Sequence, residues 1–166
     1  MDKLYIETSV VSYATAWPSR DIAIAGLQQQ ARDWWANERH AFELVTSQLT
    51  LDEAGDGDPS AAADRLKLLD GLPLVDIDQN VEALAHRLID AHTMPEKAMA
   101  DAFHVAAAAL GGVKYLLTLN CRHIANAHEL PRIYNLLDAE GLGQLLICTP
   151  TEFLGNDDDD DQPDSR

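Results

Sequence analysis

The stretch from Met94 to Ile124 constrains the fold more than any other part of the sequence. It starts with a proline and a glutamate at 95–96, which are typical of the first turn of a helix. Alanine and valine then recur at helical spacing over residues 98–109, and a glycine pair predicts the helix end. The apolar run at 113–119 is typical of a strand buried on both faces. The stretch therefore predicts a helix leading into a buried parallel strand.

The rest of the chain repeats this alternation. The helix after the first strand is predicted to begin with Thr8 or Ser9 as its cap. Because helices alternate with strands, the pattern predicts one α/β domain with a parallel sheet. Strands are expected at 4–6, 41–46, 73–77, 113–119 and 145–148. Helices are expected from residue 10, at 22–39, 47–54, 60–69, 79–92 and 131–140, with a short helical turn at 121–128 and a short final helix after residue 149.

Length and composition limit the class of protein. The chain has 166 residues, of which 46% are hydrophobic and 24% charged, as in an ordinary globular domain. We expect one domain over residues 1–155 and a disordered acidic tail over 156–166. The sequence has no apolar run near the length of a membrane span and no signal-peptide pattern. Cys121 and Cys148 lack metal-type spacing and are interpreted as reduced residues of a cytoplasmic protein.

The net charge is strongly negative. The formal value is −16, and the sequence stays clearly acidic when the aspartates of the tail are left out. Such a chain repels nucleic acid in bulk. The charge therefore predicts either a basic partner or metal ions that hold a negatively charged substrate against the local field.

Four polar side chains fall where a parallel sheet would gather them. Glu7 follows the first strand, and Asn120 follows the strand at 113–119. Glu53 lies beside Asp52 in the helix after the second strand, and Asp101 lies early in the central helix. Acids in first helical turns also have a plain electrostatic role, which is the alternative interpretation of Glu7 and Asp101. Because open α/β sheets place ligands at the carboxyl ends of their strands, we expect these side chains to converge.

A cluster of carboxylates is unfavourable without a counter-charge. Mg²⁺ accepts oxygen ligands and keeps several waters, and Mn²⁺ accepts the same ligands. Such an ion lowers the pKa of a bound water and stabilises charge on a phosphoryl oxygen. A convergent acid cluster would therefore favour metal-assisted hydrolysis of a phosphodiester.

Four segments of the sequence resemble the PIN-domain family, most closely the VapC-like toxins of bacterial toxin–antitoxin pairs. They occur in the family's order and cover nearly the whole chain except the acidic tail. The segments are Tyr5 to Val10, Leu51 to Ala54 followed by Gly57 to Pro59, Asp101 to Ala106 running on to Leu116 to Asn120, and Cys148 to Glu152. The resemblance implies a three-layer α/β/α sandwich with a central parallel sheet and a Mg²⁺- or Mn²⁺-dependent endoribonuclease.

The resemblance also implies a role for each acid. By position, Glu7, Glu53 and Asp101 would bind the metal ion, and Asn120 would help to orient the attacking water. Asp52 would be a solvated neighbour. Supporting hydrogen bonds are implied for Thr8 or Ser9 and for Thr118.

The sequence departs from the family pattern at two places. Glu7 stands where the family usually has Asp, and one extra methylene shifts a ligand by about a bond length. Asn120 and His123 stand where a fourth acid is expected. The carbonyl oxygen of Asn120 can coordinate a metal ion, but it brings no charge. The site is therefore expected to bind a second metal ion weakly or not at all.

Several other side chains have more than one interpretation. His104 is expected to lie on the side of Asp101 and to act as its structural partner. The adjacent Trp34 and Trp35 are expected to serve the core and an oligomer or partner contact, with base stacking as the alternative. A few cations near the expected site could contact an RNA backbone or be plain surface charge: Arg122, Lys114 and Arg132.

Two functions remain open from the sequence. The first is a toxin-type, metal-dependent ribonuclease that is silenced by a cognate antitoxin with a basic, amphipathic docking segment. The second is a catalytically degenerate PIN-like binding module that acts through protein or RNA contacts. The replaced acids favour the second function, and the order of the motifs favours the first. A homodimer is permitted by the tryptophan pair and by the habit of the family.

Overall fold

Four parallel strands form the centre of the computed structural model, which describes residues 1–153. The strands are β1 (Lys3–Ile6), β2 (Glu43–Val45), β3 (Tyr115–Leu117) and β4 (Leu146–Cys148). Their order in the sheet is β2-β1-β3-β4. Tyr5 of β1 is paired with Val45 on one side and with Leu116 on the other. The predicted parallel sheet is confirmed, and β1 lies inside it.

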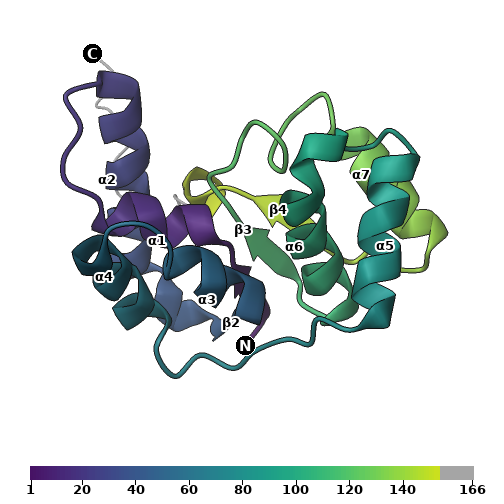
Figure 1. Cartoon of the computed structure of the whole chain (residues 1–166), viewed down its shortest axis with the longest axis horizontal. Coiled ribbons are helices and arrows are strands. Elements are labelled where there is room, and N and C mark those ends of the chain that lie inside the picture. Colours follow the sequence, from purple (N-terminus) through teal and green to yellow (C-terminus); the bar gives the residue numbers. More distant parts are fainter. Residues whose placement is uncertain (154–166) are drawn as a thin grey trace, which may run out of the picture.

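Helices cover both faces of the sheet (Figure 1). One group lies on the side of β2, and the other packs beside β3 and β4. The first group is α1 (Thr8–Thr15), α2 (Ile22–Asn37), α3 (Gln48–Ala54) and α4 (Pro59–Leu69), and the second is α5 (Gln79–Asp90), α6 (Met99–Leu110) and α7 (Leu130–Ala139). Single 3-10 turns are found at η1 (Arg39–Ala41), η2 (Glu96–Ala98) and η3 (Pro150–Phe153). The three-layer α/β/α arrangement is confirmed.

The sheet separates two hydrophobic cores. Tyr5 and Leu116 face the core that is built with α5, α6 and α7. Leu4, Ile6 and Leu117 face the opposite core, which contains buried residues from α1, α2, α3 and α4. Because neighbouring residues of a strand point to opposite faces, strands buried on both faces must be apolar throughout. This explains the continuous apolar run that marked β3 in the sequence.

The strand order places a switch point between β1 and β3. The chain moves outward from β1 to β2 and then crosses over β1 to form β3 on its other side. Ligands of open α/β sheets bind at the carboxyl ends of the strands where the order reverses in this way. Glu7 and Thr118 are the first residues after β1 and β3. The topology therefore predicts a ligand site at the same edge of the sheet where the sequence predicted that the acids converge.

The strand predicted at 73–77 is wrong. Only Leu74 forms an isolated bridge, to Thr46. Two hydrogen bonds hold the segment, from the N–H of Thr46 to Pro73 and from the N–H of Val75 to Thr46. Pro73 has no N–H to donate, and Leu74 and Ile77 are 45% and 39% exposed. The segment therefore runs along the sheet edge as extended chain.

Two helix starts differ from the prediction. Glu7, and neither Thr8 nor Ser9, is the N-cap of α1, and its carboxylate accepts from the N–H of Ser9. Glu96 is the first residue of the 3-10 turn η2, and Pro95 precedes that turn. The helix α6 begins only at Met99. Asp101 remains in the first turn of α6. The expected short helix at 121–128 consists of hydrogen-bonded turns.

The tryptophan pair is divided between two environments. Trp34 is fully buried, while Trp35 is half-buried beneath the guanidinium of Arg39. The prediction that this pair serves the core is therefore correct for Trp34. Because Trp34 is buried, the two residues do not form an exposed tryptophan pair for an oligomer contact. Within residues 1–153, no helix is long and apolar enough to span a bilayer. The predicted acidic tail, 156–166, lies outside the described residues.

Candidate active site

Glu7 is held at the end of β1 by one of its two carboxylate oxygens. Its Oε2 accepts hydrogen bonds from the N–H of Ser9 at 2.9 Å, from the Ser9 hydroxyl and from the Thr118 hydroxyl at 2.9 Å. No residue in the described range donates to its Oε1. Among these residues the only buried side-chain polar atom without a partner is Nε1 of Trp34, so Oε1 of Glu7 has access to solvent. Glu7 therefore presents one free oxygen at the switch point.

Glu53 is held in the same way from α3. Its Oε1 accepts the Thr8 hydroxyl at 2.6 Å and lies 2.5 Å from Nε2 of His104. No hydrogen bond from residues 1–153 reaches Oε2. Desolvation raises the pKa of this carboxyl, but the hydrogen bond and attraction of His104, together with the bond from Thr8, lower it further than desolvation raises it. Glu53 is therefore held in its ionised form.

Asp101 and Asn120 form the third part of the site. Burial raises the pKa of Asp101, and a side-chain hydrogen bond with Asn120 opposes part of that rise. The carbonyl oxygen of Asn120 accepts the N–H of His123 at 3.1 Å, so the NH₂ group of Asn120 is the one that faces the carboxylate. Asn120 therefore supports Asp101 with a donor, at a position where a fourth acid was expected.

Glu7, Glu53 and Asp101 lie in one region of the structure, although their side chains do not form a complete metal-binding site. Asp101 is close enough to Glu53 and His104 for their charges to affect its pKa, and the pKa of Glu7 responds to His104. Yet no three His, Cys, Asp or Glu residues of the described chain stand at separations suited to one ion. In chemistry the donor set fits Mg²⁺ or Mn²⁺: three carboxylates, with a free oxygen on Glu7 and on Glu53. The donor types therefore fit the ion, although the side chains of the described residues do not surround a common point.

Sequence reasoning missed the partner of His104. This fully buried imidazole contacts Glu53, and not Asp101 as expected. Its other nitrogen, Nδ1, lies 2.8 Å from the hydroxyl of Tyr5. Two signals were present in the sequence: Tyr5 is a polar residue in a buried strand, and His104 follows Asp101 by one helical turn. The spacing indicated a shared face, but it could not show which acid would meet the ring.

Replacing Glu7 by glutamine should stabilise the metal-free protein at neutral pH. Burial raises the pKa of Glu7 above that of the unfolded chain, so wild-type stability falls as pH rises from about 4 through the folded-state pKa. Glutamine keeps an acceptor for Ser9 and Thr118 without the buried charge. We expect a gain of about 0.5–2 kcal/mol at pH 7 that shrinks toward zero near pH 4. Urea unfolding in EDTA at both pH values measures it.

The matched control for this change is Asp52→Asn, which removes an exposed carboxylate from the neighbouring helix. That variant should show no comparable gain at pH 7. A Glu7→Gln gain of equal size at pH 4 and pH 7 would contradict the argument, because protonation of Glu7 would then have no effect on stability.

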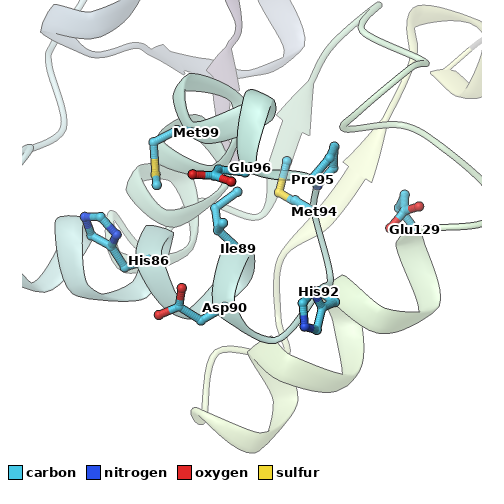
Figure 2. A pocket seen from close by; sticks show the side chains of 9 residues that line it. All are labelled: His86, Ile89, Asp90, His92, Met94, Pro95, Glu96, Met99 and Glu129. Atoms are coloured by element: carbon cyan, nitrogen blue, oxygen red, sulfur yellow. The ribbon is translucent and has the colours of Figure 1, made fainter.

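One hollow of the structure is not lined by Glu7, Glu53 or Asp101. It has a volume of about 730 Å³ and lies between the end of α5 and the turn that leads into α6 (Figure 2). Its lining combines apolar side chains, histidines and acids: His86, Ile89, Asp90, His92, Met94, Pro95, Glu96, Met99 and Glu129. None of the predicted site residues borders it. This hollow is therefore separate from the predicted site at the switch point.

Comparison with known proteins agrees with the fold. The family described as the PIN domain matches residues 4–135. This range includes β2, β3, all but the first residue of β1, and every predicted site residue. No curated protein matches the chain. The match covers well over half of the sequence. The chain therefore belongs to the PIN-domain family, whose members are generally metal-dependent nucleases.

Proposed function

We propose that this protein is a toxin-type endoribonuclease that hydrolyses RNA phosphodiester bonds with Mg²⁺ or Mn²⁺. Glu7, Glu53 and Asp101 would hold the ion. The observation that carries the proposal is the shared arrangement of Glu7 and Glu53. In each carboxylate one oxygen is fixed by protein donors and the other has no partner among residues 1–153. Such carboxylates are oriented in advance to bind a cation through the remaining oxygen.

A divalent cation bound there would promote ionisation of a water and would stabilise the charge that develops on the phosphoryl oxygens. The remaining work belongs to the protein. Ser9 and Thr118 hold Glu7, while the side chain of Asn120 lowers the pKa of Asp101. The new bond joins the water oxygen to phosphorus, the bond to the leaving ribose oxygen breaks, and that oxygen takes up a proton.

Two hollows near the predicted acids give nucleotides room. One of about 400 Å³ is bordered by Ser9, Asn120 and Arg122. The other, of about 590 Å³, is bordered by Asp52 and Ala100, which are the direct neighbours of Glu53 and Asp101. Arg122 is an exposed cation in the first hollow and is suited to a backbone phosphate. These hollows support an RNA chain that crosses the carboxylates.

A toxin of this kind requires an antitoxin, and we propose one with a basic, amphipathic docking segment. The net charge of −16 favours a basic partner. Trp17 and Ile22 are 92% and 90% exposed, which gives an apolar anchor at the start of α2. A homodimer is compatible with the same surface. A cytoplasmic location fits the two free cysteines.

The second candidate is a PIN-like binding module without catalysis. The observation that favours it is Asn120, whose donor group faces Asp101 and adds no charge for a metal ion. A binding module would retain RNA or protein contacts without cleaving RNA. The two candidates therefore differ in one measurable property, which is hydrolysis.

The deciding experiment incubates the purified protein with end-labelled RNA in Mn²⁺, in Mg²⁺ and in EDTA. We expect cleavage with either ion and none with the chelator. Because water attacks phosphorus, the new ends should carry a linear phosphate and a hydroxyl group. A 2′,3′-cyclic phosphate would indicate attack by the ribose hydroxyl and would expose a contaminating nuclease. An absence of cleavage at all metal concentrations, with the protein folded, would support the binding module.

A further inference from the structure

A chain of hydrogen bonds runs through the core to Glu53. Its first members are the hydroxyls of Ser47 and Thr50, which lie 2.6 and 3.2 Å from the hydroxyl of Tyr5. Tyr5 in turn lies 2.8 Å from Nδ1 of His104, and Nε2 of His104 lies 2.5 Å from Oε1 of Glu53. The chain joins β1, the start of α3 and α6 to the end of α3. It therefore ties the helix that carries Glu53 to the two elements that carry Glu7 and Asp101.

The imidazole has a fixed orientation. His104 and Tyr5 are both fully buried, and their rings meet edge to face at 5.9 Å. Each ring nitrogen of His104 has one partner, so rotation of the ring would break both contacts. The ionised carboxylate of Glu53 can only accept, so Nε2 must be the donor. This holds in both protonation states of the ring, since Nδ1 either accepts from Tyr5 or donates to it.

The consequence falls on the geometry of Glu53. Its Oε1 receives two donors, Nε2 of His104 and the hydroxyl of Thr8. Glutamate has three side-chain torsions, and a single contact at Oε1 would leave the carboxylate free to swing. Two donors from different elements fix the plane of the group. Its Oε2 is then left pointing away from both donors and without a partner in residues 1–153.

We propose that His104 is a positioning residue for Glu53, and that its Nε2–H fixes Oε1 so that Oε2 is presented to the divalent cation. The inference rests on the proposed function, because it assigns Glu53 as a ligand. Tyr5 holds the ring in that role and does not touch the ion. Outer hydrogen-bond partners of metal ligands typically change metal affinity by about 10–100-fold.

Two amide substitutions at His104 separate positioning from folding. Glutamine can place an N–H near the site of Nε2, whereas the shorter asparagine reaches only the site of Nδ1. Both bury a neutral amide in the same core position. We expect His104→Gln to bind Mn²⁺ within about threefold of wild type, and His104→Asn to bind about 10–100-fold more weakly. Both should lose thermal stability to a similar extent. Isothermal titration with Mn²⁺ and thermal unfolding measure these quantities.

A spectroscopic measurement on the metal-free wild type keeps the proposal testable if both variants unfold. A buried Nε2–H that donates to a carboxylate should give a slowly exchanging ring proton in the NMR spectrum, assigned to His104. This resonance should shift in Glu53→Gln. It should stay in place in Asp52→Asn, whose carboxylate is exposed and bonded by Gln48.

The outcomes distinguish this inference from the proposed function. Equal Mn²⁺ affinities of the two amide variants, or the lack of a protected ring proton, would overturn the role of His104 even if RNA is cleaved. Retained Mn²⁺ binding with the expected difference between the variants, but without RNA cleavage, would overturn only the nuclease. A folded wild type that binds no Mn²⁺ would overturn both.

Discussion

Replacing Trp34 by alanine is expected to lower the free energy of unfolding by about 3–5 kcal/mol. The side chain is fully buried on the face of the sheet that holds Leu4 and Ile6. Its ring stacks on Phe42 at 6.0 Å and meets Phe153 edge to face at 6.2 Å. Alanine would leave a cavity among rigid aromatic rings that collapse poorly, so the loss should lie in the upper part of the range for core substitutions. Urea unfolding monitored by circular dichroism measures it.

Trp17 provides the matched control because it is the same residue type at 92% exposure. The change Trp17→Ala should alter stability by no more than about 0.5 kcal/mol. A third variant tests the indole nitrogen, since Nε1 of Trp34 is buried without a partner among the described residues. Phenylalanine removes that unsatisfied donor, so Trp34→Phe should cost clearly less than Trp34→Ala. Similar losses for the alanine variants at positions 17 and 34 would contradict the packing argument.

The central helix and strand could be predicted because local signals and burial agree there. In α6 the alanine-rich pattern, the glycine stop and the buried face all indicate one structure, and seven of its residues are buried. The apolar run of β3 is short and follows a glycine pair, which is typical of a strand covered on both sides. The positions of Glu7, Glu53 and Asp101 near one edge then followed from the parallel sheet.

Other features depended on contacts that the spacing does not determine. The segment at 73–77 has the composition of a strand, but its place at the sheet edge allows it only two hydrogen bonds. Glu7 caps α1 because its carboxylate reaches the N–H of Ser9, although Thr8 and Ser9 are of residue types that cap helices more often. The choice of His104 between Asp101 and Glu53 is likewise set by the tertiary structure, which brings Glu53 of α3 to Nε2 of His104.

The change Asp101→Asn is expected to reduce RNA cleavage by more than about 100-fold. Loss of a hydrogen-bond partner of a ligand already costs about 10–100-fold in activity or metal affinity, and the ligand itself should cost more. Stability should be unchanged or slightly higher, because burial raises the pKa of Asp101 and its charge is therefore unfavourable in the metal-free fold. Initial rates of cleavage at saturating Mn²⁺ and urea unfolding in EDTA are the two measurements. Asp33→Asn, which removes an exposed carboxylate from α2, is the control and should stay within about twofold of the wild-type rate.

The opposite substitution, Asn120→Asp, tests whether the site has too little negative charge to bind the metal ion well. Asn120→Asp would place a carboxylate against Asp101, where a donor now stands, so the metal-free protein should lose stability through repulsion of like charges. Mn²⁺ neutralises both groups, so its affinity should rise and much of the lost stability should return. If cleavage also increases, alone or together with Glu7→Asp, the natural site is limited by its missing acid. If Mn²⁺ affinity falls instead, the amide of Asn120 is required to orient Asp101, and the present residue is the one suited to this site.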